Sequence, residues 1–591
     1  MTVLPSTQPR ARPRPPSWTP PTRLSSLVFA GKMAAFRLRR TARDLVDGPP
    51  RLAQGPMAGA AVVAGESVTP LWSDERLAER AWQLGKVQNL RVACRALDGL
   101  MIPAGAVFSF WRHVGPPVTA RGFVRGRMLQ QGCLTPAVGG GLCQLSNALY
   151  EAALQAGCRI VERHPHSRIV PGSAAAWGRD ATVAWNYVDL RFAPPGDLRL
   201  VARLTGQALV VRLMRPPQAG AAPATAPGES ARPDAAARTC GTCEETECFL
   251  HEHDDRAPPA VAGRRAFLVD EAWPELQAHV AAERRGEDRL GLPLDGARWR
   301  LARYAWFNDG FATTVAAPLA ALSRSAALRS AGLQGAARRG AELAGAQRIA
   351  AALARRLLSP DVTELVVAQA YLPFLHRAGH LGGRDVSVLM TRLPMAVLQA
   401  RLDAAAEAHP GRATLSDYRA PAGLAEAEAE ALAQATRIVT PHAEIAALFG
   451  PRAVLLDWQS PPPSSAGRPS AAPGRIAFPG PTVARKGAHA VRAAALALDL
   501  EVVLLGAELE GADFWTGVRT QRPADADWRT AVAVVQPALV EDQPRRLLAA
   551  LAAGLPVIAT PACGLTPRLG LTLVPAGDET ALIAALAVLM G

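Results

Sequence analysis

Cys143 follows a run of three glycines in the segment LTPAVGGGLCQLSNALYEAALQAG, residues 134–157. The spacing of the apolar residues predicts a helix that starts at the glycines and ends at Gly157, a favourable C-terminal cap. Ser146, Asn147 and Tyr150 share its polar face with Cys143. Because the N–H groups of a helix N-terminus stabilise a thiolate, and glycines let a substrate approach the backbone, Cys143 suits the role of a nucleophile.

Histidine and aspartate residues follow Cys143 in the order that a Cys-His-Asp catalytic site requires. His164 and His166 lie in VERHPHSRIVPG, and Asp180 opens a segment that reads as a strand. The same order occurs in papain-like and transglutaminase-like catalysis. Two alternatives stay open: Cys143 is a small packing residue beside histidines that organise a turn, or the His-Pro-His segment ligates a metal.

A second group of reactive side chains lies in CGTCEETECFLHEH, residues 240–253. Two residues separate the first two cysteines, so both sulfurs can reach one ion, and a third cysteine and a histidine complete a tetrahedral site. We expect zinc there; an iron–sulfur cluster is the alternative. The expected ligands are Cys240, Cys243, Cys248 and His251.

Cationic and acidic side chains occur at two loops near the C-terminal end. Arg485 and Lys486 precede a predicted helix in RIAFPGPTVARKGAHAVRAA, residues 475–494, and Glu541 follows a predicted strand. Cations at a helix N-terminus stabilise a departing diphosphate. Ordinary solvated loop charges are the alternative interpretation of Lys486 and Glu541.

The elements that position these residues fall into several predicted domains, since 591 residues exceed one hydrophobic core. Short β-branched runs alternate with Ala/Leu-rich helical stretches after residue 263, which indicates parallel sheets. These expected strands are TELVVAQ, ATRIVTP, RAVLLDW, RIAFPG, LEVVLLG, VAVVQP and LPVIATP. We expect an α/β multidomain chain with these parts: a basic Pro-rich tail at 1–62, an α+β domain at 63–215, a linker at 216–237, a small Cys/His metal knot at 238–256, and two Rossmann-like halves at 264–435 and 436–591.

Composition narrows the partners and the location. The net charge is +14, but the basic residues are spread along the whole chain, so we discount nucleic acid. Neither a transmembrane stretch nor a signal pattern is evident, so we expect a cytoplasmic protein. Residues 24–36, followed by Arg37, Arg39 and Arg40, favour an ordinary docking helix or a disordered tail; a short helix that lies on a membrane surface is the alternative.

Five segments between residues 66 and 214 resemble the VanW family, which is associated with glycopeptide-resistance clusters and the cell wall. They are IPAGAVFSFWRHVG (102–115), RGFVRGRML (121–129), GGGLCQLSNALYEAAL (139–154), VERHPHSRIVPG (161–172) and GRDATVAWNYVDLRF (178–192). The resemblance implies an α+β VanW-like domain and assigns no mechanism. Many members are membrane-anchored, and this chain shows no such segment.

The C-terminal region resembles retaining glycosyltransferases of the GT-B fold. The resemblance implies that Gly480 and Lys486 contact the donor diphosphate and that Glu541 is the first of two donor-binding acids. Pro481 replaces the family's arginine, for which Arg485 could substitute, and Ala549 replaces the second acid. His442 lies in a segment, 435–449, that resembles the first element of the C-terminal half.

Together these observations predict an enzyme of bacterial envelope or glycoconjugate metabolism that transfers a sugar from a nucleotide-sugar to an unknown acceptor, which the VanW-like domain recognises or modifies. One rival is a Cys-His enzyme acting on an amide or peptide bond. Another is a metal-stabilised scaffold without chemistry, which Pro481 and Ala549 favour.

Overall fold

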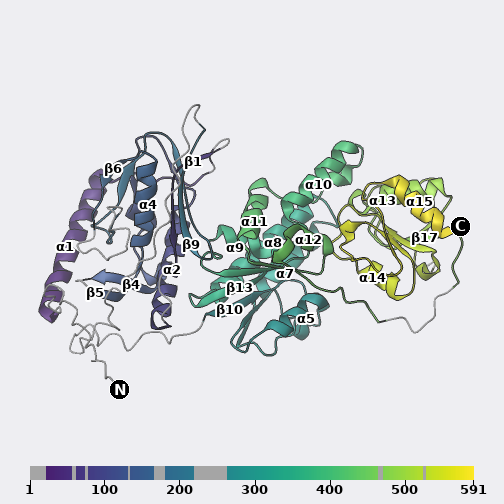
Figure 1. Cartoon of the computed structure of the whole chain (residues 1–591), viewed down its shortest axis with the longest axis horizontal. Helices are drawn as coiled ribbons and strands as arrows, with labels where there is room; N and C mark the ends of the chain where they lie inside the picture. The colour runs from purple at the N-terminus through teal and green to yellow at the C-terminus, as the bar shows by residue number, and fades with distance from the viewer. Residues whose placement is uncertain are drawn as a thin grey trace, which may run out of the picture. The chain divides into compact units, whose positions relative to one another are not determined.

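A computed structural model describes residues 22–55, 57, 61–72, 77–130, 133–165, 180–217, 263–462, 470–523 and 527–590. The chain forms two compact units, Met1–Ala262 and Gly263–Gly591, shown together in Figure 1. Of the expected site residues, His166, Cys240, Cys243, Cys248 and His251 lie outside the described residues.

Unit 1 is built on an antiparallel sheet in the order β1-β9-β8-β2. Its strands are β1 (Val62–Pro70), β2 (Met101–Ile102), β8 (Leu198–Leu204) and β9 (Ala208–Arg215). Helices α2 (Leu77–Leu97) and α4 (Cys143–Gln155) pack on it. Every second residue of β8 is buried, because alternate side chains of a strand point to opposite faces. The core of unit 1 therefore lies between this sheet and the two helices.

Smaller elements complete unit 1. Strands β3 (Phe108–Ser109), β7 (Arg191–Ala193) and β6 (Arg159–Glu162) form a second antiparallel sheet, and β4 (Arg125–Gln130) pairs with β5 (Cys133–Val138). A short helix, α3 (Phe110–Val114), continues β3. Together these elements surround the start of α4.

Helix α1 (Arg23–Asp47) lies along one side of unit 1, beside β6 (Figure 1). It begins with a capping box, in which the Ser25 N–H donates to Thr22 and the Thr22 N–H donates to Ser25. Arg40 holds it to β6 through two hydrogen bonds to Glu162, at 3.0 and 2.7 Å. Of the two interpretations favoured for this segment, the structure therefore has the docking helix, over residues 23–47.

Unit 2 begins with a seven-stranded parallel sheet in the order β12-β11-β10-β13-β14-β15-β16. Its strands are β10 (Arg264–Leu268), β11 (Arg289–Leu292), β12 (Thr313–Ala316), β13 (Val362–Ala368), β14 (Asp385–Leu389), β15 (Arg437–Thr440) and β16 (Ala453–Leu455). The helices between them are α5 (Pro274–Glu283), α6 (Gly296–Trp299), α7 (Pro318–Ser330), α8 (Ala336–Leu357), α9 (Leu372–Arg377), α10 (Met395–Ala408), α11 (Ala422–Gln434) and α12 (Ala443–Phe449).

A second parallel sheet follows in the order β19-β18-β17-β20-β21-β22. Its elements are β17 (Arg475–Phe478), α13 (Ala488–Ala497), β18 (Glu501–Leu504), β19 (Arg519–Gln521), β20 (Ala533–Gln536), α14 (Arg545–Ala552), β21 (Val557–Ala559), β22 (Leu571–Leu573) and α15 (Glu579–Met590). The prediction of parallel, Rossmann-like α/β halves is confirmed.

The expected boundary between the halves at residue 436 is wrong. Residues 435–449 were expected to open the C-terminal half, but β15 pairs with β14 and β16 pairs with β15. Both strands therefore complete the first sheet. The chain passes to the second sheet between β16 and β17, residues 456–474.

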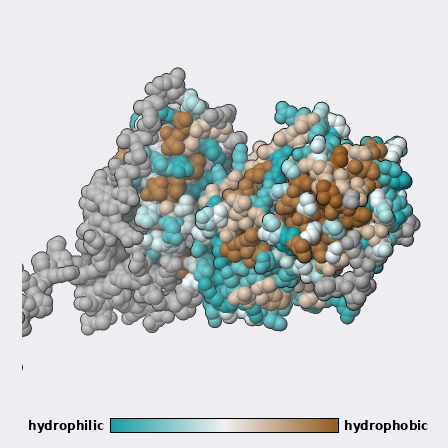
Figure 2. Space-filling view, turned by 45° about the vertical axis from the view of Figure 1, so that its right-hand side comes forward, coloured by the Kyte–Doolittle hydropathy of each residue, from teal (hydrophilic) through white to brown (hydrophobic). Residues whose placement is uncertain are grey.

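The two halves of unit 2 share a hydrophobic cluster. It contains Phe267 and Val366 from the first sheet together with Ala477 and Val557 from the second. On the face that Figure 2 presents, hydrophobic patches alternate with hydrophilic residues. In the described part of the chain, no helix is long and apolar enough to cross a membrane.

Candidate functional site

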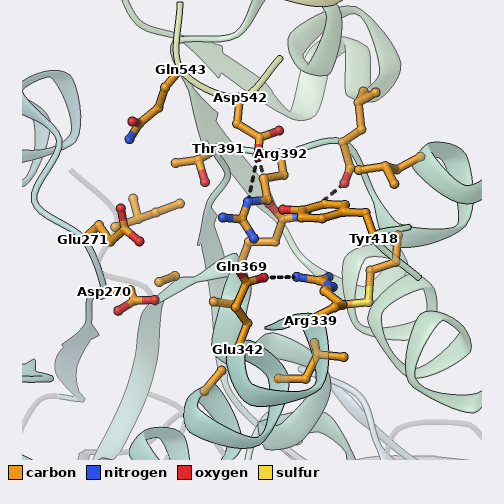
Figure 3. A pocket seen from close by; sticks show the side chains of 18 of the residues that line it. Asp270, Glu271, Arg339, Glu342, Gln369, Thr391, Arg392, Tyr418, Asp542 and Gln543 are labelled. Carbon is orange, nitrogen blue, oxygen red and sulfur yellow. Dashed lines mark hydrogen bonds and ion pairs between the residues drawn. The ribbon is translucent and has the colours of Figure 1, made fainter. Parts of the chain in front are cut away.

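A cavity of about 320 Å³ lies in unit 2, with residues of both Rossmann-like halves in its walls. Figure 3 shows Asp542 and Gln543 reaching it from one direction, Arg339 and Glu342 from another, and Arg392 beside Tyr418 in the middle. A volume of this size falls within the range of small-molecule sites.

The first half contributes residues that follow three neighbouring strands. Asp270 comes two residues after β10, Gln369 directly after β13, and Thr391 and Arg392 just after β14. In parallel sheets the carboxyl ends of the strands meet at one edge, where ligands bind. These polar residues therefore converge on the cavity although up to 122 positions separate them.

Lys486 enters the cavity from the second half, at the end of a short 3₁₀ turn that leads into α13. The next residue, Gly487, has φ = +86°, and a Cβ there would lie 2.4 Å from the Pro537 carbonyl oxygen. Only glycine fits both conditions. The backbone thereby fixes Lys486 next to the N-terminus of α13.

Glu541 faces Lys486 and is held from three sides. The Lys486 ammonium lies 3.1 Å from its carboxylate, the Gln543 N–H donates to it at 2.9 Å, and the Gln536 amide also donates to it. Only 10% of the Glu541 side chain is exposed. Lys486 and Glu541, both predicted to contact the donor, thus form one ion pair in the cavity wall.

Tyr418 is surrounded by three guanidinium groups. Those of Arg339, Arg392 and Arg485 lie 4.6, 5.7 and 5.5 Å from the centre of its ring. Burial raises the pKa of Tyr418 to about 12, so its hydroxyl keeps its proton at neutral pH. The result is a hydroxyl donor enclosed by three guanidinium groups, two of which pair with carboxylates.

Each cation that lines the cavity already has a carboxylate partner. Arg392 lies 2.9 Å from Asp542, Arg339 lies 3.1 Å from Glu342, and Arg324 lies 2.7 Å from Asp270. Arg303 pairs with Glu271, and Lys486 pairs with Glu541. Arg485 differs: in the described part of the chain it has no ion pair with a carboxylate, and it lies beside Lys486.

Glu428 is a buried acid in the cavity wall, with 1% of its surface exposed. It accepts hydrogen bonds from the Met395 N–H at 2.5 Å and from the Gln369 amide at 3.1 Å. Burial raises its pKa, because few contacts replace the lost hydration. Glu428 therefore orients Gln369 at the cavity edge.

The remaining predicted residues of unit 2 support the cavity from outside. A Cβ on Gly480 would lie 3.3 Å from the Lys486 Cβ, so this glycine packs closely against the lysine stem. His442 is buried beneath Glu541: its Nε2 lies 3.1 Å from the Glu541 carbonyl oxygen, and its Nδ1 accepts from the Ile445 N–H. His442 is thus a positioning residue. Ala549 lies on α14 and places no acid there.

In unit 1, Cys143 is the first residue of α4, as expected, and is partly exposed. Its sulfur lies 3.8 Å from the Thr182 hydroxyl and 3.9 Å from the Val183 carbonyl oxygen. The Thr182 N–H donates to the His164 carbonyl oxygen, so the His164 backbone is close by. The exposed His164 ring instead lies 3.3 Å from Glu162, and Asp180 is buried. Catalysis by these residues stays a prediction.

The glycine run before Cys143 has a packing role. A Cβ on Gly140 would lie 2.3 Å from the Gly126 backbone, and one on Gly141 would lie 2.3 Å from the Lys86 side chain. The Asn89 amide donates to the Gly140 carbonyl at 2.9 Å. The glycines therefore allow α2 and β4 to approach the start of α4. Burial lowers the pKa of Lys86, beside this turn, to about 8.

Metal ligation stays a prediction for the Cys/His segment, which lies outside the described residues. Within the described ranges, no group of three or more His, Cys, Asp or Glu residues is arranged to hold a metal ion.

Sequence reasoning did not identify Asp270, Arg339, Arg392, Tyr418 or Asp542 as site residues. Two weak signals were present: Asp270 and Arg392 each follow a short buried strand, and Asp542 adjoins Glu541. Tyr418 offers no local pattern, although its φ of +67° marks an unusual backbone.

Remote structural likenesses cover unit 2. The lipopolysaccharide outer core galactosyltransferase WaaB in its apo form is 11% identical with a TM-score of 0.32, and covers 55% of this chain and 90% of its own. Sucrose-phosphate synthase from Thermosynechococcus elongatus is 15% identical with a TM-score of 0.36, and the match covers 56% of this chain and 90% of the synthase. These TM-scores are low, and the Rossmann-like fold of unit 2 follows from its own strand order.

Sequence similarity to two curated relatives covers about a fifth of the chain. The Bacillus subtilis (strain 168) uncharacterized protein YoaR is 38% identical over 104 residues, which are 18% of this chain and 34% of the relative. The vancomycin B-type resistance protein VanW of Enterococcus faecalis (strain ATCC 700802 / V583) is 36% identical over 115 residues, which are 19% of this chain and 41% of the relative. The chain thus spans about two fifths or less of these relatives. The family model VanW like protein matches residues 85–214, and this chain therefore carries a VanW-like domain.

Proposed function

We propose that unit 2 is a glycosyltransferase that binds a nucleotide-sugar in the cavity between its two Rossmann-like halves. One observation carries the proposal: the carboxyl ends of strands from the first sheet and the Lys486–Glu541 pair of the second line a single cavity. The donor diphosphate lies at Arg485, Lys486 and the N-terminus of α13. The acceptor enters from the side of Asp270 and Glu271.

Sugar transfer from a nucleotide-sugar requires stabilisation of the departing diphosphate. The bond between the sugar carbon and the diphosphate oxygen breaks with its electron pair on the diphosphate, the acceptor hydroxyl oxygen bonds to that carbon, and its proton passes to the departing diphosphate. Arg485, which has no carboxylate partner among the described residues, and Lys486 offset the growing negative charge. The N-terminus of α13, which begins two residues after Lys486, adds a partial positive charge of the kind that other phosphate-binding helices use. Arg392 supplies a third cation once it releases Asp542.

Glu541 acts in this proposal by holding Lys486. Its carboxylate is itself fixed by Gln536 and by the Gln543 backbone, and His442 fixes its carbonyl from below. Pre-organisation of this kind reduces the cost of ordering the lysine when the donor binds. Because Ala549 replaces the second donor-binding acid, the sugar of the donor is contacted by residues of the first half in this proposal.

The acceptor belongs to the bacterial envelope or to glycoconjugates in this proposal. The similarity of residues 85–214 to the vancomycin B-type resistance protein supports an envelope acceptor, which the VanW-like domain recognises. A cytoplasmic location is part of the same proposal.

Isothermal titration of the full chain with UDP-, GDP- and dTDP-sugars tests it. We expect one nucleotide to bind and the variants Lys486→Ala and Arg485→Ala to bind it 10- to 100-fold more weakly, because each removes a charge-assisted contact worth about 1.5–3 kcal/mol. Product analysis with the preferred donor then detects sugar release or transfer.

Arg519→Ala is the matched control, since this arginine lies in the same half and pairs at the surface with the exposed Asp499. It should bind the donor as the wild type does. Absence of binding heat with every nucleotide-sugar at millimolar concentration would show that the proposal is wrong.

A further inference from the structure

Helix α1 presents an apolar stripe to solvent on the side opposite its contacts with unit 1. Leu24, Val28, Leu38 and Leu45 recur at helical spacing, and 74%, 51%, 73% and 82% of their surfaces are exposed. Leu27 and Val46 widen the stripe at 71% and 81%. No residue of this 25-residue helix is buried. An ordinary surface helix turns its apolar face inward, so this orientation requires an explanation.

The opposite, polar side of α1 makes the contacts with unit 1. The Arg37 Nε donates to the Trp185 carbonyl at 2.8 Å, the Asn186 amide donates to the Thr41 hydroxyl at 3.0 Å, and Arg191 donates to Asp44 at 2.9 Å. Arg40 adds its pair of bonds to Glu162 on β6. These contacts lie on the side of the helix opposite the stripe. They fix the rotation of the helix about its axis, so the leucines face outward.

Basic side chains flank the stripe. Lys32, Arg39 and Arg43 lie along one edge when the helix is viewed down its axis, all three are exposed, and none has an ion pair with a described carboxylate. The acids of α1 are Asp44 and Asp47, and Asp44 is engaged by Arg191. The outward face therefore combines apolar residues with uncompensated positive charge.

We propose that α1 is an interfacial helix that binds unit 1 to an anionic lipid surface, with its leucines among the acyl chains and Lys32, Arg39 and Arg43 at the headgroups. A helix of this length covers about 37 Å along the surface. Apolar area and positive charge act together in such binding. The inference is independent of the function proposed for unit 2.

A second copy of the chain suits this face less well. Paired helices bring their flanking positions together, and α1 has three basic residues along one flank without acids to match them. An anionic bilayer supplies the missing negative charge.

Flotation of the full chain with vesicles tests the proposal. The wild type should float with vesicles of phosphatidylcholine and 30% phosphatidylglycerol and remain below with pure phosphatidylcholine, and its binding should weaken at high salt. The triple variant Leu27→Ser, Leu38→Ser, Leu45→Ser should bind at least tenfold more weakly. Lys32→Gln, Arg39→Gln, Arg43→Gln should lose the preference for anionic vesicles.

The matched control is Leu319→Ser, Leu569→Ser, which changes two leucines of unit 2 with 85% and 100% exposure and should bind as the wild type does. The stripe is solvent-exposed, so the serine variant should keep the melting temperature of the wild type. Equal flotation of wild type and stripe variant would overturn the proposal. A dimer in sedimentation experiments that the stripe variant abolishes would also overturn it, and would identify a second copy as the occupant.

Discussion

Arg545 and Glu275 join the two halves of unit 2 through two parallel hydrogen bonds of 2.6 and 2.5 Å. The Glu275 side chain is fully buried. The guanidinium lies 5.6 Å from the ring centre of Trp273 and 5.2 Å from that of Trp458. This contact fixes the start of α14, which follows the loop of Glu541.

Removing the cation from this pair should destabilise unit 2. Arg545→Ala leaves a buried carboxylate without its partner, at a cost of about 3 kcal/mol in the free energy of unfolding. Urea denaturation measures it. Arg519→Ala, whose partner Asp499 is exposed, should cost less than about 0.5 kcal/mol. The double variant Glu275→Gln, Arg545→Gln should lose less than the sum of the single variants; strict additivity would contradict a direct interaction.

Gly487→Ala should lower both stability and donor binding. Its φ of +86° strains any other residue, and the new Cβ would also meet the Pro537 carbonyl, so the Lys486 turn has to shift. Gly474→Ala is the control: its φ is +73°, but nothing lies within 4 Å of the added carbon. We expect the control to lose about 1 kcal/mol of unfolding free energy, and Gly487→Ala to lose about 2 kcal/mol more. Equal losses in thermal unfolding would show that the close contact is unimportant.

The stability of unit 2 should fall as the pH drops below about 6.5, partly through His442. Burial lowers the pKa of His442 in the fold, although the neighbouring carbonyls oppose this. The unfolded chain therefore binds the proton more readily, and stability is lost as the pH falls from the ordinary histidine pKa towards the lowered one.

His442→Asn tests this dependence, because asparagine keeps a side-chain acceptor at the start of α12 and does not titrate. The variant should show a smaller loss of unfolding free energy between pH 7 and pH 5 than the wild type. His409→Asn, at an exposed position, should leave the wild-type slope unchanged. A wild-type slope in His442→Asn would assign the effect to other groups.

Arg40→Ala should release α1 from unit 1. The variant leaves Glu162 without its partner on α1, so we expect the α1 amides to exchange hydrogen at least tenfold faster. Arg39→Ala, at the next position but facing outward, should not change exchange. Equal exchange in the two variants would show that the pair with Glu162 does not anchor the helix.

The same anchor should weaken in acid. Burial opposes ionisation of Glu162 and Asp44, but Arg40 and Arg191 outweigh it and lower the pKa of both carboxyls. Their contribution to stability is present above the ordinary carboxyl pKa values near 4 and is lost as the pH falls through the lowered values. Exchange of the α1 amides, corrected for intrinsic rates, should therefore accelerate below about pH 4, and Arg40→Ala should remove much of this change.

The strands that the sequence predicted share one property. TELVVAQ, RIAFPG, LEVVLLG and VAVVQP are short apolar runs, typical of strands covered on both faces, and they became β13, β17, β18 and β20. Strands β10 and β14 were not identified, because RRAFL begins with two arginines and DVSVL alternates polar with apolar residues, so neither opens as a continuous apolar run. Strand β15 was identified but placed in the wrong half, because a local pattern does not reveal which sheet a strand joins.

The candidate site divides in the same way. Lys486 and Glu541 were found because their loops resemble those of glycosyltransferases, with Lys486 before a predicted helix and Glu541 after a predicted strand. Asp270, Arg392 and Tyr418 were not, because strand order alone brings them together. The glycines at 139–141 suggested substrate access, whereas their neighbours Gly126 and Lys86 show close packing. No local signal separates these two uses of glycine.

Every cation that lines the cavity is paired with a carboxylate, so binding of an anion there exchanges one ion pair for another. An entering anion has to displace a carboxylate for each of these cations that it takes, so a ligand with a single negative charge gains little. A ligand with several adjacent negative charges could bind Lys486 and Arg392 at once and also reach Arg485, which lies beside Lys486 and needs no carboxylate displaced. We therefore expect the cavity to bind ligands with several adjacent negative charges in preference to small monovalent anions.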